Sequence, residues 1–312
     1  MTTKKWGESF LKSGMPLEHL THVTLRSDGW LCHPEKEIKR PNNVGEQTWF
    51  SIDLEASHPK INCDVILTLL IECKYHDTSR FWFFMPHEPF RWHFDDRFLN
   101  IGPYNTIRSP RSKRFLKLAP TSSGGIVVSN NGNKQDNAVY TATQQLLNAF
   151  FPHCLSSLFG HNLDFENTYD DQRQFTPSCE AVIPVIVTNA TLYRLKPEIT
   201  DLQIISDAKE PSDIADELEW TWLYHDGSNQ LYNQNLDAAQ EHITQKSKYV
   251  HRYPFVEDLI YLYASRPNWI AVVNIKSLQT ASKSILQCFK RTKMLPVEHF
   301  ISPPQSKGHK KK

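Results

Sequence analysis

Three side chains with acid–base character lie close to the ends of apolar segments. Asp53 lies within residues 51–55. Glu72 and Lys74 lie at the end of the apolar segment 65–74, which finishes with Glu72-Cys73-Lys74. Because side chains alternate along a β-strand, Glu72 and Lys74 point to one face and Cys73 to the other. Charged groups at the end of an Ile- and Leu-rich strand are costly unless they are paired or bind a metal ion. The pattern therefore predicts a metal site.

The predicted ligands are all oxygen atoms, which hard divalent cations prefer. The carboxylates of Asp53 and Glu72 and the backbone carbonyl of Cys73 would leave coordination positions for water and for a phosphate oxygen. Lys74 would then lie next to the bound water, favouring hydroxide and countering the negative charge of the transition state. We expect Mg²⁺ (or Mn²⁺) as cofactor and hydrolysis of a phosphodiester as the reaction.

The elements that must position these residues follow from periodicity and turn signals. Apolar residues at helical spacing, after a proline and before a glycine, predict a helix over Leu17–Leu25. Three segments of strand character follow it: Trp30–Ile38, Thr48–Ala56 and Val65–Lys74. The third is almost continuously apolar, as expected of a central strand covered on both faces.

Strand and helix signals alternate over the rest of the chain and predict an α/β fold. A helix is expected from Ala138 to Phe150 and a strand and turn over Val182–Leu195. A further strand over Trp269–Ile275 leads into an amphipathic helix. The Gly- and Asn-rich stretch 124–137 is predicted to be a loop.

This order of elements and charges resembles the PD-(D/E)xK, restriction-endonuclease-like superfamily, in the style of its Mrr-like branch. Three segments carry the resemblance: residues 13–18, which open the first helix, residues 52–56, and residues 70–75. The last, Leu70-Ile71-Glu72-Cys73-Lys74-Tyr75, is the most specific. Ile52 precedes Asp53 where the motif's name has proline, a departure that many members share.

The resemblance implies a fold and a set of roles. The fold is a restriction-endonuclease-like core with a mixed central β-sheet flanked by helices, in one elaborated domain over residues 1–300. Its core would span 13–85 with elements from 138–195 and 269–291; residues 80–137 and 196–268 would be insertions, and 301–312 a disordered basic tail. Asp53 and Glu72 would bind the metal ion, Lys74 would assist the attacking water, and Glu18 would complete the metal shell.

The activity implied is that of a metal-dependent endonuclease acting on DNA, with RNA not excluded, in bacterial defence or DNA processing. The same residues are also compatible with less specialised roles. Glu72 and Lys74 could be an ordinary exposed ion pair, and Glu18 also suits the first turn of a helix because of the helix macrodipole. The chain could instead be an inactive member of the fold that binds nucleic acid or a partner protein.

Residues 80–117 carry eight basic and three acidic residues, interleaved with aromatic residues. Basic side chains neutralise phosphates and aromatic rings stack on bases, so this segment could line a nucleic-acid groove. Arg108, Arg111, Lys113 and Arg114 are the predicted contacts. Residues 81–84 (Phe-Trp-Phe-Phe) are more typical of a buried strand.

Residues 198–219 have the opposite charge, with eight acidic residues and one basic residue. Such runs usually form a solvated surface. Here the run could also shield a basic groove and hold a nuclease in check until a regulatory partner arrives.

The overall composition excludes several classes of protein. The formal net charge of +1 gives no global attraction to nucleic acid or membrane, so any charge-based function must be local. No apolar run is long enough for a membrane helix, and residues 1–8 do not resemble a signal peptide. We therefore expect a soluble cytoplasmic protein without a membrane partner, which could form a homo-oligomer. Nucleotide-binding P-loop, Rossmann and serine-hydrolase motifs are absent, and His19 and His22 lack the HExxH arrangement of a zinc site.

Overall fold

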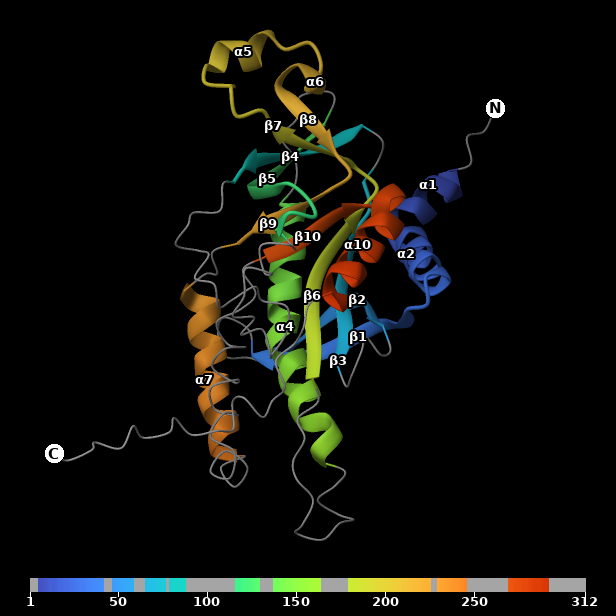
Figure 1. Cartoon of the computed structure of the whole chain (residues 1–312), viewed down its shortest axis with the longest axis vertical. Coiled ribbons are helices and arrows are strands. Elements are labelled where there is room, and N and C mark those ends of the chain that lie inside the picture. The colour runs from blue at the N-terminus through green and yellow to red at the C-terminus, as the bar shows by residue number, and fades with distance from the viewer. Residues whose placement is uncertain are drawn as a thin grey trace, which may run out of the picture.

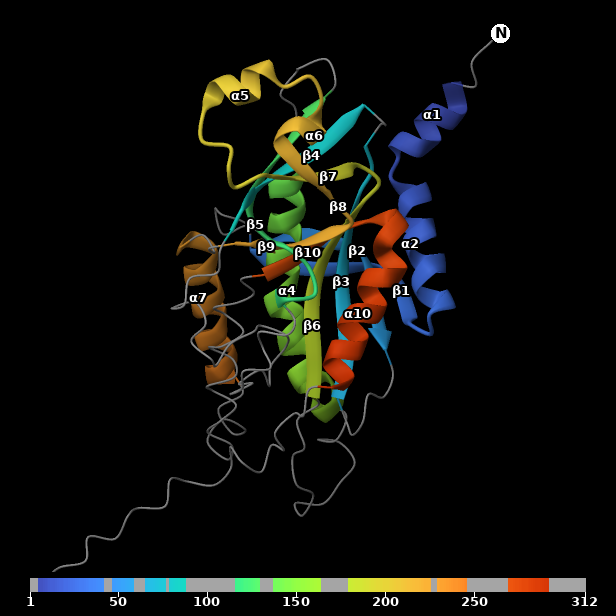
Figure 2. The same ribbon diagram turned by 45° about the horizontal axis from the view of Figure 1, so that its top comes forward.

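One large mixed β-sheet organises the protein. The computed structural model describes residues 5–41, 47–58, 65–76, 79–87, 116–129, 137–163, 179–225, 229–245 and 269–291. Ten strands within these ranges form the sheet in the order β1-β2-β3-β6-β10-β9-β5-β4-β7-β8. Helices α2 and α10 cover one face and α4 and α7 the other (Figures 1 and 2). The predicted α/β class and the mixed sheet flanked by helices are confirmed.

The N-terminal elements match the sequence pattern closely. Helix α2 (Met15–Ser27) begins after Gly14, which has a φ of 84°. Strands β1 (Leu31–Pro41), β2 (Gln47–His58) and β3 (Val65–Lys74) follow it and pair antiparallel in chain order. A preceding helix, α1 (Lys5–Lys12), was not predicted.

Strand β3 is an interior strand, as its apolar sequence predicts. It pairs antiparallel with β2 and, over its whole length, parallel with β6 (Cys179–Thr188). The chain reaches β6 through α4 (Ala138–Leu163), which packs on β2, β3 and β6. Strand β10 (Trp269–Asn274) extends the parallel part of the sheet beyond β6. Burial on both faces explains why β3 and β6 are apolar at almost every position.

The other half of the sheet comes largely from the segments expected to be insertions. It consists of β4 (Arg80–Pro86), β5 (Thr121–Ser129), β7 (Thr191–Leu195), β8 (Ala215–Leu218) and β9 (Trp220–Tyr224). The prediction of a loop over 124–137 is wrong in its first part, because Ile126, Val127 and Val128 pair with β4 despite two neighbouring glycines.

The remaining helices are α5 (Leu202–Asp207), α6 (Pro211–Ile214), α7 (Asn229–Gln245) and α10 (Leu278–Lys290), the last preceded by the 3₁₀ turn η1 (Ile275–Ser277). All eight acidic residues of 198–219 are exposed, as expected of a solvated surface. No helix in the described ranges is both long and apolar enough to cross a bilayer.

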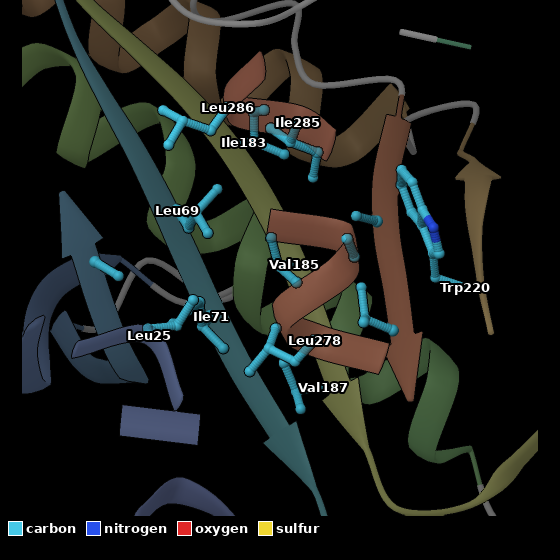
Figure 3. Packing of buried hydrophobic residues seen from close by; sticks show 14 of the residues in the cluster. Leu25, Leu69, Ile71, Ile183, Val185, Val187, Trp220, Leu278, Ile285 and Leu286 are labelled. Carbon is cyan, nitrogen blue, oxygen red and sulfur yellow. The ribbon is translucent and has the colours of Figure 1, made fainter. Parts of the chain in front are cut away.

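Two apolar clusters hold the helices to the sheet. Leu25, Ile71 and Ile285 belong to the cluster that joins α2 and α10 to β3, β6 and β10 (Figure 3). Leu70 and Val182 belong to the cluster beneath α4. Successive residues of β3 thus contribute to opposite faces, and the strand is fixed from both sides at the end that carries Glu72 and Lys74.

Candidate active site

Asp53 and Glu72 meet where the pairing of β2 with β3 ends. The last backbone pair is Leu54 with Ile71, so Asp53 and Glu72 are the next residues on each strand. Beyond that pair, the Asp53 carboxylate takes the place of a backbone acceptor: its Oδ2 accepts the Cys73 N–H at 2.6 Å. The predicted approach of Asp53 to the Glu-x-Lys segment is present in the structure.

Local backbone irregularity accounts for the position of Asp53. Ile52 packs in the cluster beneath α4, whereas Leu54 packs in the cluster beneath α2 and α10. Residues two apart in a regular strand share a face, so the alternation of β2 breaks at Asp53. On the neighbouring strand, Glu35 lies between the pairs Pro34–Leu54 and Lys36–Ile52 and has a φ of 40°. At this irregular part of β1 and β2, the Asp53 carboxylate lies next to the last residues of β3.

Glu72 is almost fully buried, with a relative exposure of 1 %. Its Oε1 accepts a hydrogen bond from Lys74 Nζ at 2.6 Å. Burial and repulsion by Asp53, opposed by Lys74, raise the pKa of Glu72 to about 7. Glu72 Oε2 is buried and has no hydrogen-bond partner among the residues that the structure describes. A buried carboxylate oxygen without a partner is costly unless a cation or donor occupies the position next to it.

Lys74 is held from two sides. Besides Glu72, its Nζ donates to Gln145 Oε1 of α4 at 2.8 Å. The Lys74 side chain keeps 22 % of its surface exposed, whereas that of its partner Glu72 keeps 1 %. The expectation of an ordinary exposed ion pair does not fit the burial of Glu72.

Gln145 was not predicted as a site residue, although the sequence contained a signal. It occupies a helical stripe with Ala138, Ala142 and Ala149, all of which are buried. A polar residue on such a stripe needs a partner in the interior. Lys74 is that partner.

Glu18 lies in the first turn of α2, where the macrodipole favours an acid. Burial raises its pKa, and repulsion by Asp53 and Glu35 adds to the effect. Burial is also the main cause of the raised pKa of Asp53. The hydrogen bond from the Cys73 N–H and the charge of Lys74 oppose this shift, and repulsion by Glu35 adds to it. Glu18 is thus within electrostatic reach of Asp53, and both expectations for it fit its position.

The acids at this strand end bear directly on the predicted metal site. Within the described ranges, no three His, Cys, Asp or Glu side chains are grouped closely enough to hold a metal ion as they stand. The donor chemistry nevertheless fits a hard cation, because Asp53 and Glu72 repel each other and Glu72 Oε2 has no hydrogen-bond partner among the described residues. In a strand, the N–H and C=O of one residue face the same neighbour, so the Cys73 carbonyl faces the Asp53 side.

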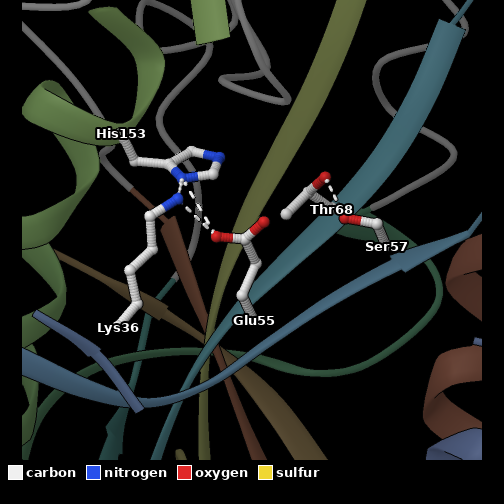
Figure 4. A network of polar contacts seen from close by, with 5 residues as sticks. All are labelled: Lys36, Glu55, Ser57, Thr68 and His153. Carbon is white, nitrogen blue, oxygen red and sulfur yellow. Dashed lines mark hydrogen bonds and ion pairs between the residues drawn. The ribbon is translucent and has the colours of Figure 1, made fainter. Parts of the chain in front are cut away.

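A second polar cluster links β1 and β2 to α4 (Figure 4). Lys36 Nζ contacts Glu55 Oε2 at 2.5 Å and His153 Nδ1 at 2.8 Å, and His153 Nδ1 lies 3.4 Å from the same Glu55 oxygen. The neighbouring hydroxyls of Ser57 and Thr68 are 3.0 Å apart across β2 and β3. His153 is buried, so this cluster anchors α4 to the strand that carries Asp53.

Two further groups of predicted residues have no described structure. Arg108, Arg111, Lys113 and Arg114 lie outside the described residues, as does the tail 301–312. His76, close to the strand end, is buried; its backbone N–H and C=O both bond to the Asn189 amide, and its ring packs edge-on against Trp82. These contacts give His76 a structural role.

Comparisons with protein-family models, with curated proteins and with solved structures find no match to this chain. Its function must therefore be argued from the site.

Proposed function

We propose that the chain is a Mg²⁺- or Mn²⁺-dependent endonuclease with a restriction-endonuclease-like core, which hydrolyses DNA phosphodiesters. The observation that carries the proposal is the meeting of Asp53, Glu72 and Lys74 at one strand end, with Asp53 bonded to the Cys73 backbone. Helix α2, strands β1 to β3, helix α4 and the parallel strand β6, with β4 and β5 inserted between β3 and α4, support the core that the resemblance implies.

Each residue has a role that its surroundings support. Asp53, Glu72 and the Cys73 carbonyl would hold the cation, with Glu18 nearby on α2. The cation would supply Lewis-acid activation of water and phosphate. Lys74 would orient the attacking water and counter the negative charge that develops on phosphate. Gln145 would keep the Lys74 ammonium in place through its 2.8 Å hydrogen bond.

The test is cleavage by the purified full-length protein, with plasmid, single-stranded DNA and RNA as substrates. We expect Mn²⁺ or Mg²⁺ to support cleavage of DNA and EDTA to abolish it. Asp53→Asn, Glu72→Gln and Lys74→Met should each reduce the rate at least about 100-fold, within the range seen when a charge-stabilising group is removed. Lys36→Met is the matched control, because Lys36 also pairs with a glutamate but lies in the second cluster.

Cleavage that persists in all three variants would identify a contaminant and refute the proposal. The absence of cleavage by wild type on every substrate and with either metal would favour the alternative, an inactive module that binds nucleic acid or a partner.

A further inference from the structure

Alternate residues of β4 have very different surroundings. Trp82 and Phe84 are buried beneath α4, with exposures of 0 % and 1 %. Phe81 and Phe83 point to the opposite face and are only partly buried. The prediction of a buried strand over 81–84 therefore holds for two of its four residues and leaves two aromatic rings to be explained.

The rings belong to a continuous apolar surface. Phe83 lies directly opposite Ile126 of β5 and Tyr193 of β7, and Phe81 lies opposite Val128. Residues in these positions share a face of the sheet. Phe83 stacks on Tyr193 with ring centroids 5.3 Å apart, and Ile126 is 51 % exposed. We call these five residues, Phe81, Phe83, Ile126, Val128 and Tyr193, the aromatic face.

Among the residues that the structure describes, α2 and α10, the two helices that cover this side of the sheet elsewhere, do not pack on the aromatic face. Helices α2 and α10 lie over the half of the sheet that contains β1, β2, β3, β6 and β10, whereas β4, β5 and β7 lie beyond them (Figure 2). The short helix α6 packs on β8, at the far edge. A contiguous, partly exposed apolar patch is a candidate interaction site.

Two acidic side chains lie beside the aromatic face. Glu217 lies directly opposite Tyr193 on β8, and Glu210 caps α6. Burial, followed by repulsion from Glu217 and Glu210, raises the pKa of the Tyr193 hydroxyl. Both glutamates are exposed, and they belong to the run 198–219 with eight acidic residues and one basic residue. We call Glu210 and Glu217 the acidic rim.

The negative charge of the acidic rim distinguishes between the kinds of molecule that could bind the aromatic face. Nucleic acid would bring phosphates to the two glutamates and be repelled. A second copy, joined through the same patch on both subunits, would bring its own acidic rim against this one. A cationic protein segment would gain from both parts of the surface, since its apolar side chains would cover the rings and its basic side chains would meet the rim.

We propose that the aromatic face and its acidic rim form a docking site for a basic protein segment that carries apolar anchor residues. This surface is built by β4, β5, β7 and β8, apart from Asp53, Glu72 and Lys74, and does not depend on nuclease activity.

The experiment uses the full-length protein and two labelled peptides, one alternating lysine with leucine and the other alternating lysine with serine. Fluorescence anisotropy should show binding of the lysine–leucine peptide about tenfold tighter than that of its serine counterpart. Ile126→Ser and Tyr193→Ser should each weaken that binding about tenfold, as expected of a contact near the centre of an interface. Glu217→Gln should weaken it and reduce its dependence on salt.

Leu31→Ser is the matched control, because Leu31 is 56 % exposed but lies on β1 at the opposite end of the sheet. It should leave binding unchanged. Equal affinity for the two peptides, or equal losses in Ile126→Ser and Leu31→Ser, would overturn the proposal. Two further results would also overturn the proposal. One is binding of oligothymidylate that Ile126→Ser abolishes, because the aromatic face would then bind nucleic acid. The other is self-association, measured by sedimentation, that Ile126→Ser abolishes, because the face would then bind a second copy.

Discussion

The carboxylate of Asp53 accepts the backbone N–H of Cys73 at 2.6 Å, so a side chain continues the hydrogen bonding of β2 with β3 after their backbone pairing stops. Asp53 therefore has two functions that substitution can separate. Its oxygen completes the strand end, and its charge contributes to the proposed cation site.

Asp53→Asn should preserve the first function and remove the second. The amide oxygen can still accept the Cys73 N–H, while the loss of charge relieves repulsion with Glu72. We expect stability in urea at pH 8 equal to or above that of wild type. Asp53→Ala should lower the free energy of unfolding by about 1–3 kcal/mol, because it leaves the Cys73 N–H without its acceptor. If the two variants lose the same stability, the hydrogen bond does not hold the strand end.

Glu72 should make the protein less stable as the pH rises. Its pKa is raised to about 7 in the folded state from an ordinary value of 4.5, so the folded state binds the proton more tightly. Its contribution is fully present below pH 4.5, is lost between pH 4.5 and 7, and is constant above that. The free energy of unfolding should fall by on the order of 3 kcal/mol over this range.

Urea denaturation of wild type and Glu72→Gln from pH 4 to 8 in EDTA measures this effect. The difference between the two unfolding free energies isolates Glu72, because Asp53 and Glu18 remain in both proteins. A difference that does not vary with pH would show that Glu72 titrates normally.

Divalent cations should stabilise the folded protein. A cation that binds only the folded state at 100 times its dissociation constant adds about 2.7 kcal/mol. We expect Mn²⁺ to raise the melting temperature of wild type and not that of Glu72→Gln, whose neutral amide replaces the buried carboxylate. The readout requires no substrate, so it separates metal binding from catalysis. An equal Mn²⁺ shift in both proteins would place the cation elsewhere.

Gln145 should act as a positioning residue for Lys74. Gln145→Leu removes the neutral acceptor at 2.8 Å and leaves the Glu72–Lys74 ion pair. A hydrogen bond to a charged group contributes about 1.5–3 kcal/mol, so we expect kcat to fall about tenfold or more and the pH–rate profile to shift. Gln144→Leu on the same helix is the control, and Gln145→Glu should restore part of the rate. A loss of stability with an unchanged pH profile would indicate a purely structural role.

The Lys36–Glu55–His153 cluster should contribute to stability and not directly to cleavage. Glu55→Ala removes the anion that lies between a lysine and a buried histidine. We expect a loss of about 1–3 kcal/mol in urea. Glu37→Ala is the control, because Glu37 is exposed on β1, and it should change stability by less than about 0.5 kcal/mol. Equal effects of the two substitutions would mean that the cluster does not anchor α4.

Local sequence pattern was sufficient for the elements around the site. The helix over Leu17–Leu25 and the strand over Val65–Lys74 carry periodicity and end signals that do not depend on distant residues. The approach of Asp53 to Glu72 also followed from consecutive strands that pair in chain order. The hydrogen bond from the Cys73 N–H to Asp53 accompanies an irregularity on β1, where Glu35 has a φ of 40°, and no sequence pattern predicts either feature.

Contacts between distant segments were beyond the sequence pattern. Gln145 joins Lys74 across 71 positions, and His153 joins Lys36 across 117. Strand β5 was missed because Gly124 and Gly125 are typical of a loop; here Gly124 has a φ of 57°, and a Cβ on Gly125 would lie 2.9 Å from the Phe84 ring of β4. Only the assembled sheet reveals that constraint.

The parallel pairing of β3 with β6 also determines when the site can form during synthesis. Asp53, Glu72 and Lys74 leave the ribosome within the first quarter of the chain, but Lys74 pairs with Thr188, and β6 is bordered in turn by residues 269–274. Non-local strand pairs form only after the intervening chain is available. A nascent polypeptide that stops before residue 179 therefore carries every acid and base of the site without the strand that aligns them.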